Sequence, residues 1–454
     1  MHKRRGGSLR VVCLALLCAV VLVMLTGCSY NQTGIDAMLK PPKLSDQQNE
    51  IYAALTASVD KGSIRLKYPR KGKFTSAFLV NNLDDEPSQE ALVFYELTGS
   101  AAGTMSLRIN VLDQQNGKWV SMQDIGAGAG TSEVEKVSFV TVEQKIYVII
   151  GFNLASTTEK SVAMYSYENG TLNEKFRTNC SNYEVIDLNN DGSSEIVTLT
   201  QKKNEAGNTT VTAELRRITT YGESQILSVA QMDPNVTEYK YITVGQLGDG
   251  RNALFLDGLR GTSVYMPEIL ACDSNQQIEN LMYDGNTMQY LEGVDQWTFD
   301  APSIDLNGDG VVEIPVKVPA PGYENTEKHQ QEFFTEWYTY EDEALKLQKT
   351  TYVAPKGYIF TIPESWIGKV TVQYVSNDDE LVIYRYEEGK PPEQRLVAIK
   401  IVKRVNYERE ANRKGYTLLR DNGQILYTYQ IYENSGGLSI TPEQVVNGFQ
   451  IYKL

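Results

Sequence analysis

Two nine-residue loops of the sequence place oxygen-bearing side chains at a spacing that suits a calcium ion. One loop runs from Asp187 to Glu195 and the other from Asp305 to Glu313, and each continues into an apolar segment. Both have acidic or amide side chains at positions 1, 3, 5 and 9 and a glycine at position 6. Calcium binds about six to eight oxygens, and the glycine permits the left-handed backbone that turns such a loop. The two loops therefore predict structural calcium sites.

The expected ligands have the same types in both loops. They are the side chains of Asp187, Asn189, Asp191 and Glu195 with the backbone carbonyl of Ser193, and the side chains of Asp305, Asn307, Asp309 and Glu313 with the carbonyl of Val311. An EF-hand fits less well, because its bidentate glutamate stands at position 12 between two helices. The alternative is a turn whose carboxylates bind backbone amides without any metal. If calcium binds, an affinity of roughly 10⁻⁴–10⁻³ M is expected for an extracellular module.

The two loops belong to a longer series of repeats. Residues 82–90 match the loop at Asp187 position for position, residues 246–254 match it with one deletion, and residues 140–149 keep only the flanking strands. The loops begin near residues 82, 141, 187, 246 and 305, so each interval has room for four strands. Four strands make one blade of a β-propeller. Pro87 stands where the glycine belongs, and proline cannot adopt the left-handed conformation, so no tight ion is expected in the first loop.

The elements that would position these loops form a mainly β protein. We expect a β-propeller of about five blades over residues 61–353, followed by a small antiparallel α+β domain over residues 354–454. The last blade offers three strands, and residues 74–80 are expected to complete it and close the ring. Residues 44–58, with Ser45 as the N-cap, predict a short amphipathic helix.

The N-terminus carries a targeting signal. Four basic residues precede an apolar run over residues 11–25, which is short for a membrane span. The run ends in Leu25-Thr-Gly-Cys28, which resembles the lipobox of bacterial lipoproteins. The resemblance implies that residues 1–27 are removed, that Cys28 carries lipid, and that residues 28–60 hold the tether and the short helix. We therefore expect a lipid-anchored protein on the extracytoplasmic face of the cell membrane; an uncleaved signal anchor is the alternative.

Composition excludes several classes of function. The net charge is −14, and loss of four basic residues with residues 1–27 makes it −18, which argues against nucleic acid or anionic lipid as a partner. His329 is the one histidine after the signal, so a histidine-rich zinc site or a Ser-His-Asp triad is not expected. Cys180 and Cys272 remain after the signal; an oxidising exterior permits a disulfide, but the two cysteines fall in different repeats.

The acidic loop and its apolar strand, in a repeat of roughly 50–60 residues, resemble the FG-GAP/VCBS family of β-propeller repeats. The resemblance covers about 290 of 454 residues, and only the loops at Asp187 and Asp305 match it well. It implies blades with calcium in the inter-strand loops, and it implies no particular activity, because adhesion modules and enzyme appendages both belong to the family.

The predicted function is therefore that of a non-enzymatic interaction module in the cell envelope. Its calcium-stabilised propeller would bind an unidentified protein or glycan. The alternative is an extracellular polysaccharide hydrolase or lyase with its site at the propeller axis, which requires acidic, arginine and tyrosine side chains to converge there. Tyrosines near strand ends, such as Tyr183, Tyr239 and Tyr241, are expected to pack between blades rather than to be exposed for ligand stacking.

Overall fold

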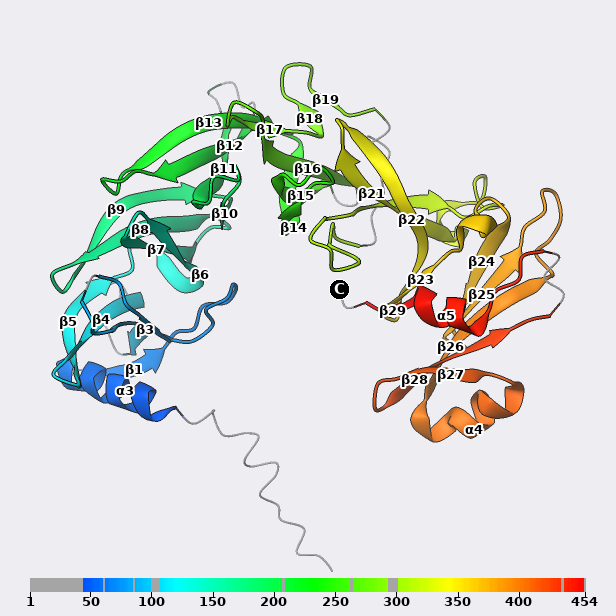
Figure 1. The fold of residues 1–454 in the computed structure, drawn as a ribbon, viewed down its shortest axis with the longest axis horizontal. Coiled ribbons are helices and arrows are strands. Elements are labelled where there is room, and N and C mark those ends of the chain that lie inside the picture. Colours follow the sequence, from blue (N-terminus) through cyan, green and yellow to red (C-terminus); the bar gives the residue numbers. More distant parts are fainter. Residues whose placement is uncertain are drawn as a thin grey trace, which may run out of the picture.

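The computed structural model describes residues 44–452 except for residues 60, 61, 85, 99–106, 204, 206–208, 262, 263, 293–300 and 434–436. The chain is mainly β, and the sheets that contain four or more strands are antiparallel. Figure 1 shows these sheets following one another along an arc whose two ends stay apart. Cys28 and the predicted signal lie outside the described residues. Within the described residues, no helix is long and apolar enough to cross a membrane.

A short helix, α3 (Asp46–Ser58), covers one end of the arc, as predicted. Ser45 Oγ accepts the amide of Gln48 at 3.2 Å and the Gln48 side chain accepts the amide of Ser45 at 3.0 Å, which is a capping box. Ile51 and Leu55 on its inner face are fully buried against the first sheet. The helix is thereby fixed to the first unit of the arc.

The first unit is a five-stranded sheet: β1 (Ser63–Leu66), β2 (Phe78–Asn81), β3 (Glu90–Thr98), β4 (Leu107–Gln115) and β5 (Lys118–Gly126). β1 and β2 both pair with β3. The expectation that residues 74–80 complete the last blade was therefore wrong. Phe78 of β2 packs with Ala91, Val93 and Tyr95 of β3 in one core, and this contact helps to keep β2 in the first unit.

The next three units each contain four antiparallel strands in chain order. Unit 2 holds β6 (Thr131–Val142), β7 (Lys145–Leu154), β8 (Lys160–Glu168) and β9 (Thr171–Cys180); unit 3 holds β10 (Asn182–Ile186), β11 (Glu195–Lys203), β12 (Thr209–Ile218) and β13 (Ser224–Met232); unit 4 holds β14 (Val236–Gln246), β15 (Asn252–Arg260), β16 (Val264–Cys272) and β17 (Ile278–Asn280). A short hairpin of β18 (Tyr283–Asp284) and β19 (Gln289–Tyr290) follows. The first strands β6, β10 and β14 lie on the concave side of the arc (Figure 1).

Unit 5 begins with an isolated bridge between Ile304 and Glu313. Its sheet contains β20 (Ile314–Pro319), β21 (Phe333–Glu341), β22 (Ala344–Ala354), β23 (Tyr358–Thr361) and the C-terminal strand β29 (Phe449–Ile451), in that order. The three strands expected here from the sequence are present. β23 pairs with β22 and occupies the place that was expected for residues 74–80. The domain boundary expected between residues 353 and 354 falls inside β22, which ends at Ala354.

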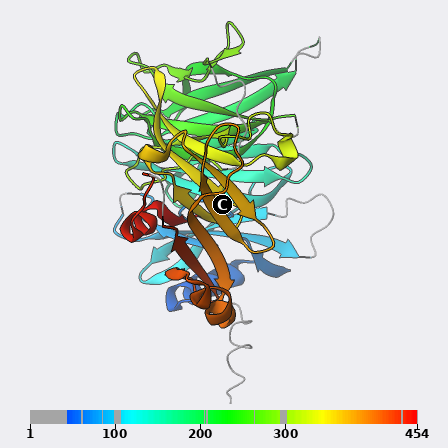
Figure 2. The ribbon, with the colours of Figure 1, turned by 90° about the vertical axis from the view of Figure 1, so that its right-hand side faces the viewer.

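The C-terminal region adds one more sheet, in the order β24 (Val370–Val375), β25 (Glu380–Arg385), β26 (Arg395–Lys403), β28 (Ile425–Ile431) and β27 (Thr417–Asp421). Helices α4 (Tyr407–Glu410) and α5 (Pro442–Gly448) accompany it, and Thr441 caps α5. Figure 2 views this end of the arc face on. Tyr352, Trp366 and Leu381 share one buried core, so this sheet packs directly on unit 5.

Candidate functional site

The third-unit loop (residues 187–194) joins β10 to β11 and is closed by its own carboxylates. Glu195 is 1% exposed, and its Oε2 accepts the amide of Leu188 at 3.0 Å. The two carboxylate oxygens of Asp187 accept the amides of Asp191 at 3.0 Å and Gly192 at 2.9 Å. These bonds hold the ends of the loop together.

The side chains at positions 3 and 5 of this loop also bind within the loop. Asn189 Oδ1 accepts the amide of Asp191 at 3.0 Å, and Asp191 Oδ1 accepts the amide of Ser193 at 2.8 Å. Asn189 Nδ2 donates to Asp191 Oδ2 at 3.1 Å. The loop therefore has the geometry of consecutive Asx turns, which is the alternative that the sequence left open.

The fifth-unit loop (residues 305–312) repeats this pattern. The amide of Leu306 donates to Glu313 Oε2 at 2.8 Å, and the amide of Gly310 donates to Asp305 Oδ2 at 2.8 Å. Asn307 Nδ2 donates to Asp309 Oδ2 at 2.8 Å, and Asp309 Oδ1 accepts the amide of Val311 at 2.8 Å. The loop between β2 and β3 of the first unit keeps the bond that the glutamate at the end of the loop accepts, since the amide of Leu83 donates to Glu90 Oε2 at 2.6 Å.

The donor chemistry of the two full loops fits a hard cation, and in this structure their carboxylate oxygens accept backbone amides. Within the described residues, no three His, Cys, Asp or Glu side chains are grouped as a metal site. Burial raises the pKa of Glu195 to about 7, and the charges of Asp191 and Asp187 add to this effect.

The fourth-unit loop (residues 247–251) differs from the other two. Gln246 pairs with Asn252 as Ile186 pairs with Glu195, so five residues stand between the paired positions in place of eight. The loop is therefore three residues shorter than the third-unit loop, and the sequence alignment with one deletion was wrong. Asn252 occupies the position of the buried glutamate.

Adjacent loops are bonded to each other along the arc. The amide of Asn252 donates to Asn190 Oδ1 at 2.9 Å, and Asn252 Nδ2 donates to the carbonyl of Asp187 at 2.6 Å. On the other side, the amide of Gln246 donates to the carbonyl of Gly310 at 2.9 Å and the amide of Val312 donates to the carbonyl of Gln246 at 3.0 Å. The loops of units 3, 4 and 5 thus connect three consecutive sheets.

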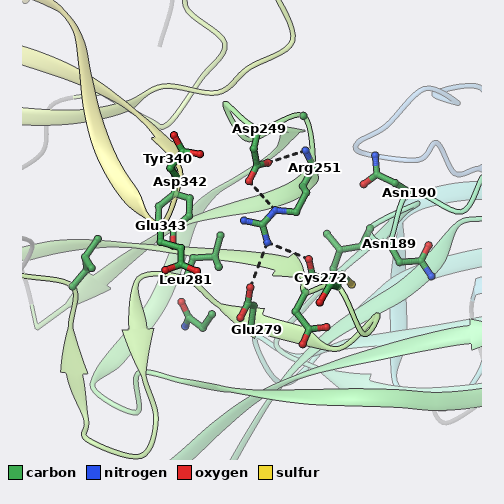
Figure 3. Close-up of a pocket in the computed structure, with 16 residues that line it drawn as sticks. Asn189, Asn190, Asp249, Arg251, Cys272, Glu279, Leu281, Tyr340, Asp342 and Glu343 are labelled. Carbon is green, nitrogen blue, oxygen red and sulfur yellow. Dashed lines mark hydrogen bonds and ion pairs between the residues drawn. The ribbon is translucent and has the colours of Figure 1, made fainter.

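The third-unit and fourth-unit loops form one wall of a pocket of 930 Å³. The third-unit and fourth-unit loops contribute to it together with the turn between β16 and β17 and the turn between β21 and β22. Figure 3 shows Arg251 at the centre of this wall, with acidic side chains around it. The charged residues that line the pocket are Arg251, Asp249, Asp273, Glu279, Asp342 and Glu343.

Arg251 is held in place by three partners. Its Nε donates to Asp249 Oδ2 at 2.9 Å, and its Nη1 lies 3.2 Å from the carbonyl of Cys272 and 3.4 Å from Glu279 Oε1 (Figure 3). Gly250, at φ +85°, provides the turn that places Asp249 and Arg251 on the same side. The five carboxylates outnumber the single guanidinium, so the pocket is acidic.

The sequence did not single out this site. In the sequence, residues 246–254 keep few of the oxygen ligands of the repeat, so they were not counted among the calcium sites. One signal was present in the sequence: this repeat has lost most of the shared ligand set and carries an arginine two positions after Asp249. The convergence of Glu279 and Glu343 on this wall depends on the packing of three sheets, which no local pattern encodes.

Charged side chains also gather on the concave side of the arc, around a cavity of 130 Å³. Glu135 on β6 pairs through Oε1 with Lys160 at 2.8 Å, and Lys136 pairs with Glu184 on β10. Glu135 Oε2 and the hydroxyl of Tyr183 are buried, and neither has a hydrogen-bond partner among the described residues. Burial, and to a lesser extent Glu135, raises the pKa of Tyr183 well above its ordinary value. Charged groups of both signs therefore line the concave strands.

The tyrosines that were expected to pack between blades differ in exposure: Tyr183 is buried as predicted, Tyr239 is half-buried, and Tyr241 is exposed. Trp337, Tyr340 and Tyr183 are buried, whereas Tyr241 is 41% exposed. Cys180 and Cys272 are free, buried thiols in different hydrophobic clusters.

Comparisons with known proteins give weak likenesses. No protein-family model matches the chain, and no curated protein matches its sequence. Among solved structures, the chain is similar to Bacillus licheniformis rhamnogalacturonan lyase PL11, with 10% identity over 70% of this chain and 74% of that one and a TM-score of 0.30. It is similar to rhamnogalacturonan lyase YesW with the same identity and coverage and a TM-score of 0.29. A GH43 β-1,3-galactosidase matches with 10% identity over 62% of this chain and 96% of that one, with a TM-score of 0.23.

Proposed function

We propose that this chain is a lipid-anchored, extracytoplasmic binding protein whose acidic pocket around Arg251 holds a ligand with basic groups. Cys28 would carry the lipid, and units 1–5 would be the blades of an open β-propeller of the FG-GAP/VCBS type. The single observation behind the binding role is the 930 Å³ pocket, which receives side chains from three consecutive units. A pocket that several elements build together is typical of ligand sites.

The charge of the pocket supports the choice of a basic ligand. Asp249 and Glu279 are paired with Arg251, and Lys346 pairs with Asp342 at 2.6 Å. Glu343 has no such partner among the described residues, and Asp273 has only amide donors near its carboxylate. The amides of Gln277 and Asn275 hold the pKa of Asp273 below its ordinary value, so it stays ionised. A lysine or arginine side chain of a partner protein would supply the missing positive charge.

In this proposal the full acidic loops serve the site indirectly. They connect units 3, 4 and 5, and calcium bound in them would stabilise the folded chain by mass action. The ion would bind through Asp187, Asp191 and Glu195 in one loop and through the matching residues of the other. The chemistry at the pocket would still be that of binding alone.

The test uses defined peptides and the full chain in detergent. Titration calorimetry should detect binding of a hexalysine peptide and no binding of hexaglutamate, and the affinity should fall as salt is added. The double variant Glu279→Gln/Glu343→Gln should lose about 10-fold or more in affinity, because two carboxylates leave the pocket.

A matched control is available on the exposed turn between β12 and β13. Glu223 is an exposed glutamate that does not line the pocket, so Glu223→Gln should leave the affinity unchanged. Equal losses in the control and in the double variant would show that binding follows net charge and would remove the pocket from the proposal.

A second candidate function is polysaccharide hydrolysis or elimination on the concave side. The observation in its favour is that Glu135 Oε2 and the Tyr183 hydroxyl are buried beside Lys136 and Lys160 without partners among the described residues. Assays for new reducing ends and for unsaturated uronates, with neutral and acidic polysaccharides, test it. Activity in the wild type that disappears in Glu135→Gln would replace the binding proposal; no activity with any substrate would exclude this candidate.

A further inference from the structure

The C-terminal region contains a second pocket whose charge is opposite to that of the Arg251 pocket. It has a volume of 620 Å³ and lies between the turn after β22, the turn between β24 and β25, strand β26 and the segment around α4. Its basic residues are Lys356, Lys400, Lys403 and Lys414. Asp378, Asp379 and Glu410 also line it, so four lysines stand against three carboxylates and the lining has a formal charge of +1, in a chain whose net charge is −14.

Lys400 is the buried member of this group. It lies on β26, is 8% exposed, and borders the cavity. Its nearest carboxylate oxygen, Asp378 Oδ1, is 3.6 Å away, which is longer than a hydrogen bond. A buried ammonium ordinarily has close acceptors for its protons, so Lys400 has donor capacity that a ligand can use.

The remaining charges leave a positive excess. Asp378 and Asp379 face Lys400 and Lys356, each at 3.6 Å, and Glu410 pairs with Arg409 at 2.7 Å. Among the described residues, neither Lys403 nor Lys414 has an ion pair, and both are exposed at the rim of the cavity. One buried and two exposed ammonium groups therefore have unused donors around a single cavity.

We propose that this pocket binds a phosphate group of a larger molecule. A phosphate carries about two negative charges at neutral pH and three strong acceptor oxygens, which match the three ammonium groups. The cavity is larger than one phosphate, so the rest of the ligand has room inside it. The acidic surface elsewhere disfavours adhesion to a broad anionic membrane, so the source is a soluble phosphate compound rather than a lipid surface. The proposal is independent of the function assigned to the Arg251 pocket.

The experiment titrates pyrophosphate into the full chain in detergent and follows the heat of binding. Lys403→Gln/Lys414→Gln should weaken binding about 10-fold or more, and these two exposed positions leave the core intact. Lys400→Met should weaken it further, with circular dichroism as the check on folding. Lys390→Gln, at an exposed lysine of the same region that pairs with Glu387 outside the cavity, is the matched control and should bind as the wild type does.

Two results would overturn the proposal. One is that pyrophosphate does not bind, or that the double variant binds it as well as the Lys390→Gln control does. The other is that the chain binds phosphatidylglycerol vesicles and not pyrophosphate, because this would assign the lysines to a membrane surface. Binding of pyrophosphate with no added retention on the vesicles, lost in the double variant alone, supports the pocket and its soluble source.

Discussion

The third-unit and fourth-unit loops stand at the same place in the repeat, touch each other, and do different things. In the third-unit loop every acidic side chain is turned inward onto backbone amides, with Glu195 buried at the end. In the fourth-unit loop Asn252 replaces that glutamate and bonds to the neighbouring loop, while Asp249 and Arg251 face a pocket. The intact copy thus binds its own backbone, and the degenerate copy contributes charged side chains to the lining of the pocket. A motif that has lost its consensus can be the more informative one about function.

The largest loss of stability should follow from truncation of the buried leucine that each of the two loops contains. Leu188 and Leu247 are fully or almost fully buried, each beneath its own loop. Leu188→Ala and Leu247→Ala should each lower the free energy of unfolding by about 2–5 kcal/mol, because each leaves a cavity. Denaturant unfolding measures this. If only Leu188→Ala destabilises the protein, Leu247 does not anchor the fourth-unit loop as Leu188 anchors the third-unit loop.

A buried carboxylate on a strand shows how burial changes the pKa of a glutamate without the influence of loop geometry. Glu268 on β16 is fully buried, and burial raises its pKa to about 7 although Tyr239, Asp233 and Asn280 donate hydrogen bonds to it. Because the folded state holds the proton more tightly, its contribution to stability is present below about pH 4.5 and is lost as the pH rises through 7. Stability should fall by on the order of 3 kcal/mol over this window.

Comparison with Glu268→Gln isolates this contribution, since the variant has no carboxyl group to titrate at this position. Its stability profile between pH 4.5 and 8 should be flatter than that of the wild type. Parallel profiles would mean that Glu268 has a similar pKa in the folded and unfolded chains, and that burial alone does not raise it.

Removal of the position-9 side chain directly contrasts the two loops. Glu195→Ala leaves the buried amide of Leu188 without a partner, which should cost about 1–3 kcal/mol. Asn252→Ala removes the one inter-loop bond that its side chain makes, from Nδ2 to the carbonyl of Asp187, at a partly exposed position, so a loss of about 1 kcal/mol or less is expected. Thermal unfolding of both variants checks the order; a greater loss for Asn252→Ala would make the contact between loops the stronger connection.

The smallest effect is expected from calcium. At a concentration a few times the dissociation constant, an ion that binds only the folded state adds about 1 kcal/mol. EGTA should lower the melting temperature and calcium should restore it, and Asp191→Ala and Asp309→Ala should each reduce that shift. Asp249→Ala in the fourth-unit loop is the control and should leave the shift unchanged. The calcium proposal fails if neither EGTA nor calcium moves the wild-type transition.

The sequence predicted local features well and long-range ones poorly. The N-cap at Ser45, three strands of unit 5 and the positions of the acidic loops follow from turn chemistry and periodicity, which are encoded within a few residues. The predictions of the strand that pairs with β2 and of the fourth strand in unit 5 were wrong, because several strands of similar length and hydrophobicity compete for each sheet edge. The pocket around Arg251 was missed, since its wall is assembled from segments about ninety residues apart that only tertiary packing brings together.

The pairing of β23 with β29 has a consequence for how the chain folds. Tyr358 and Ile451, which face each other across this pair, stand 93 positions apart in the sequence. Until the last strand arrives, β23 is an open sheet edge that can recruit a strand from another molecule, and a contact of this range is slow to form. We expect unit 5 to be the last to mature after synthesis, so that chains caught before this step are the ones most prone to aggregate.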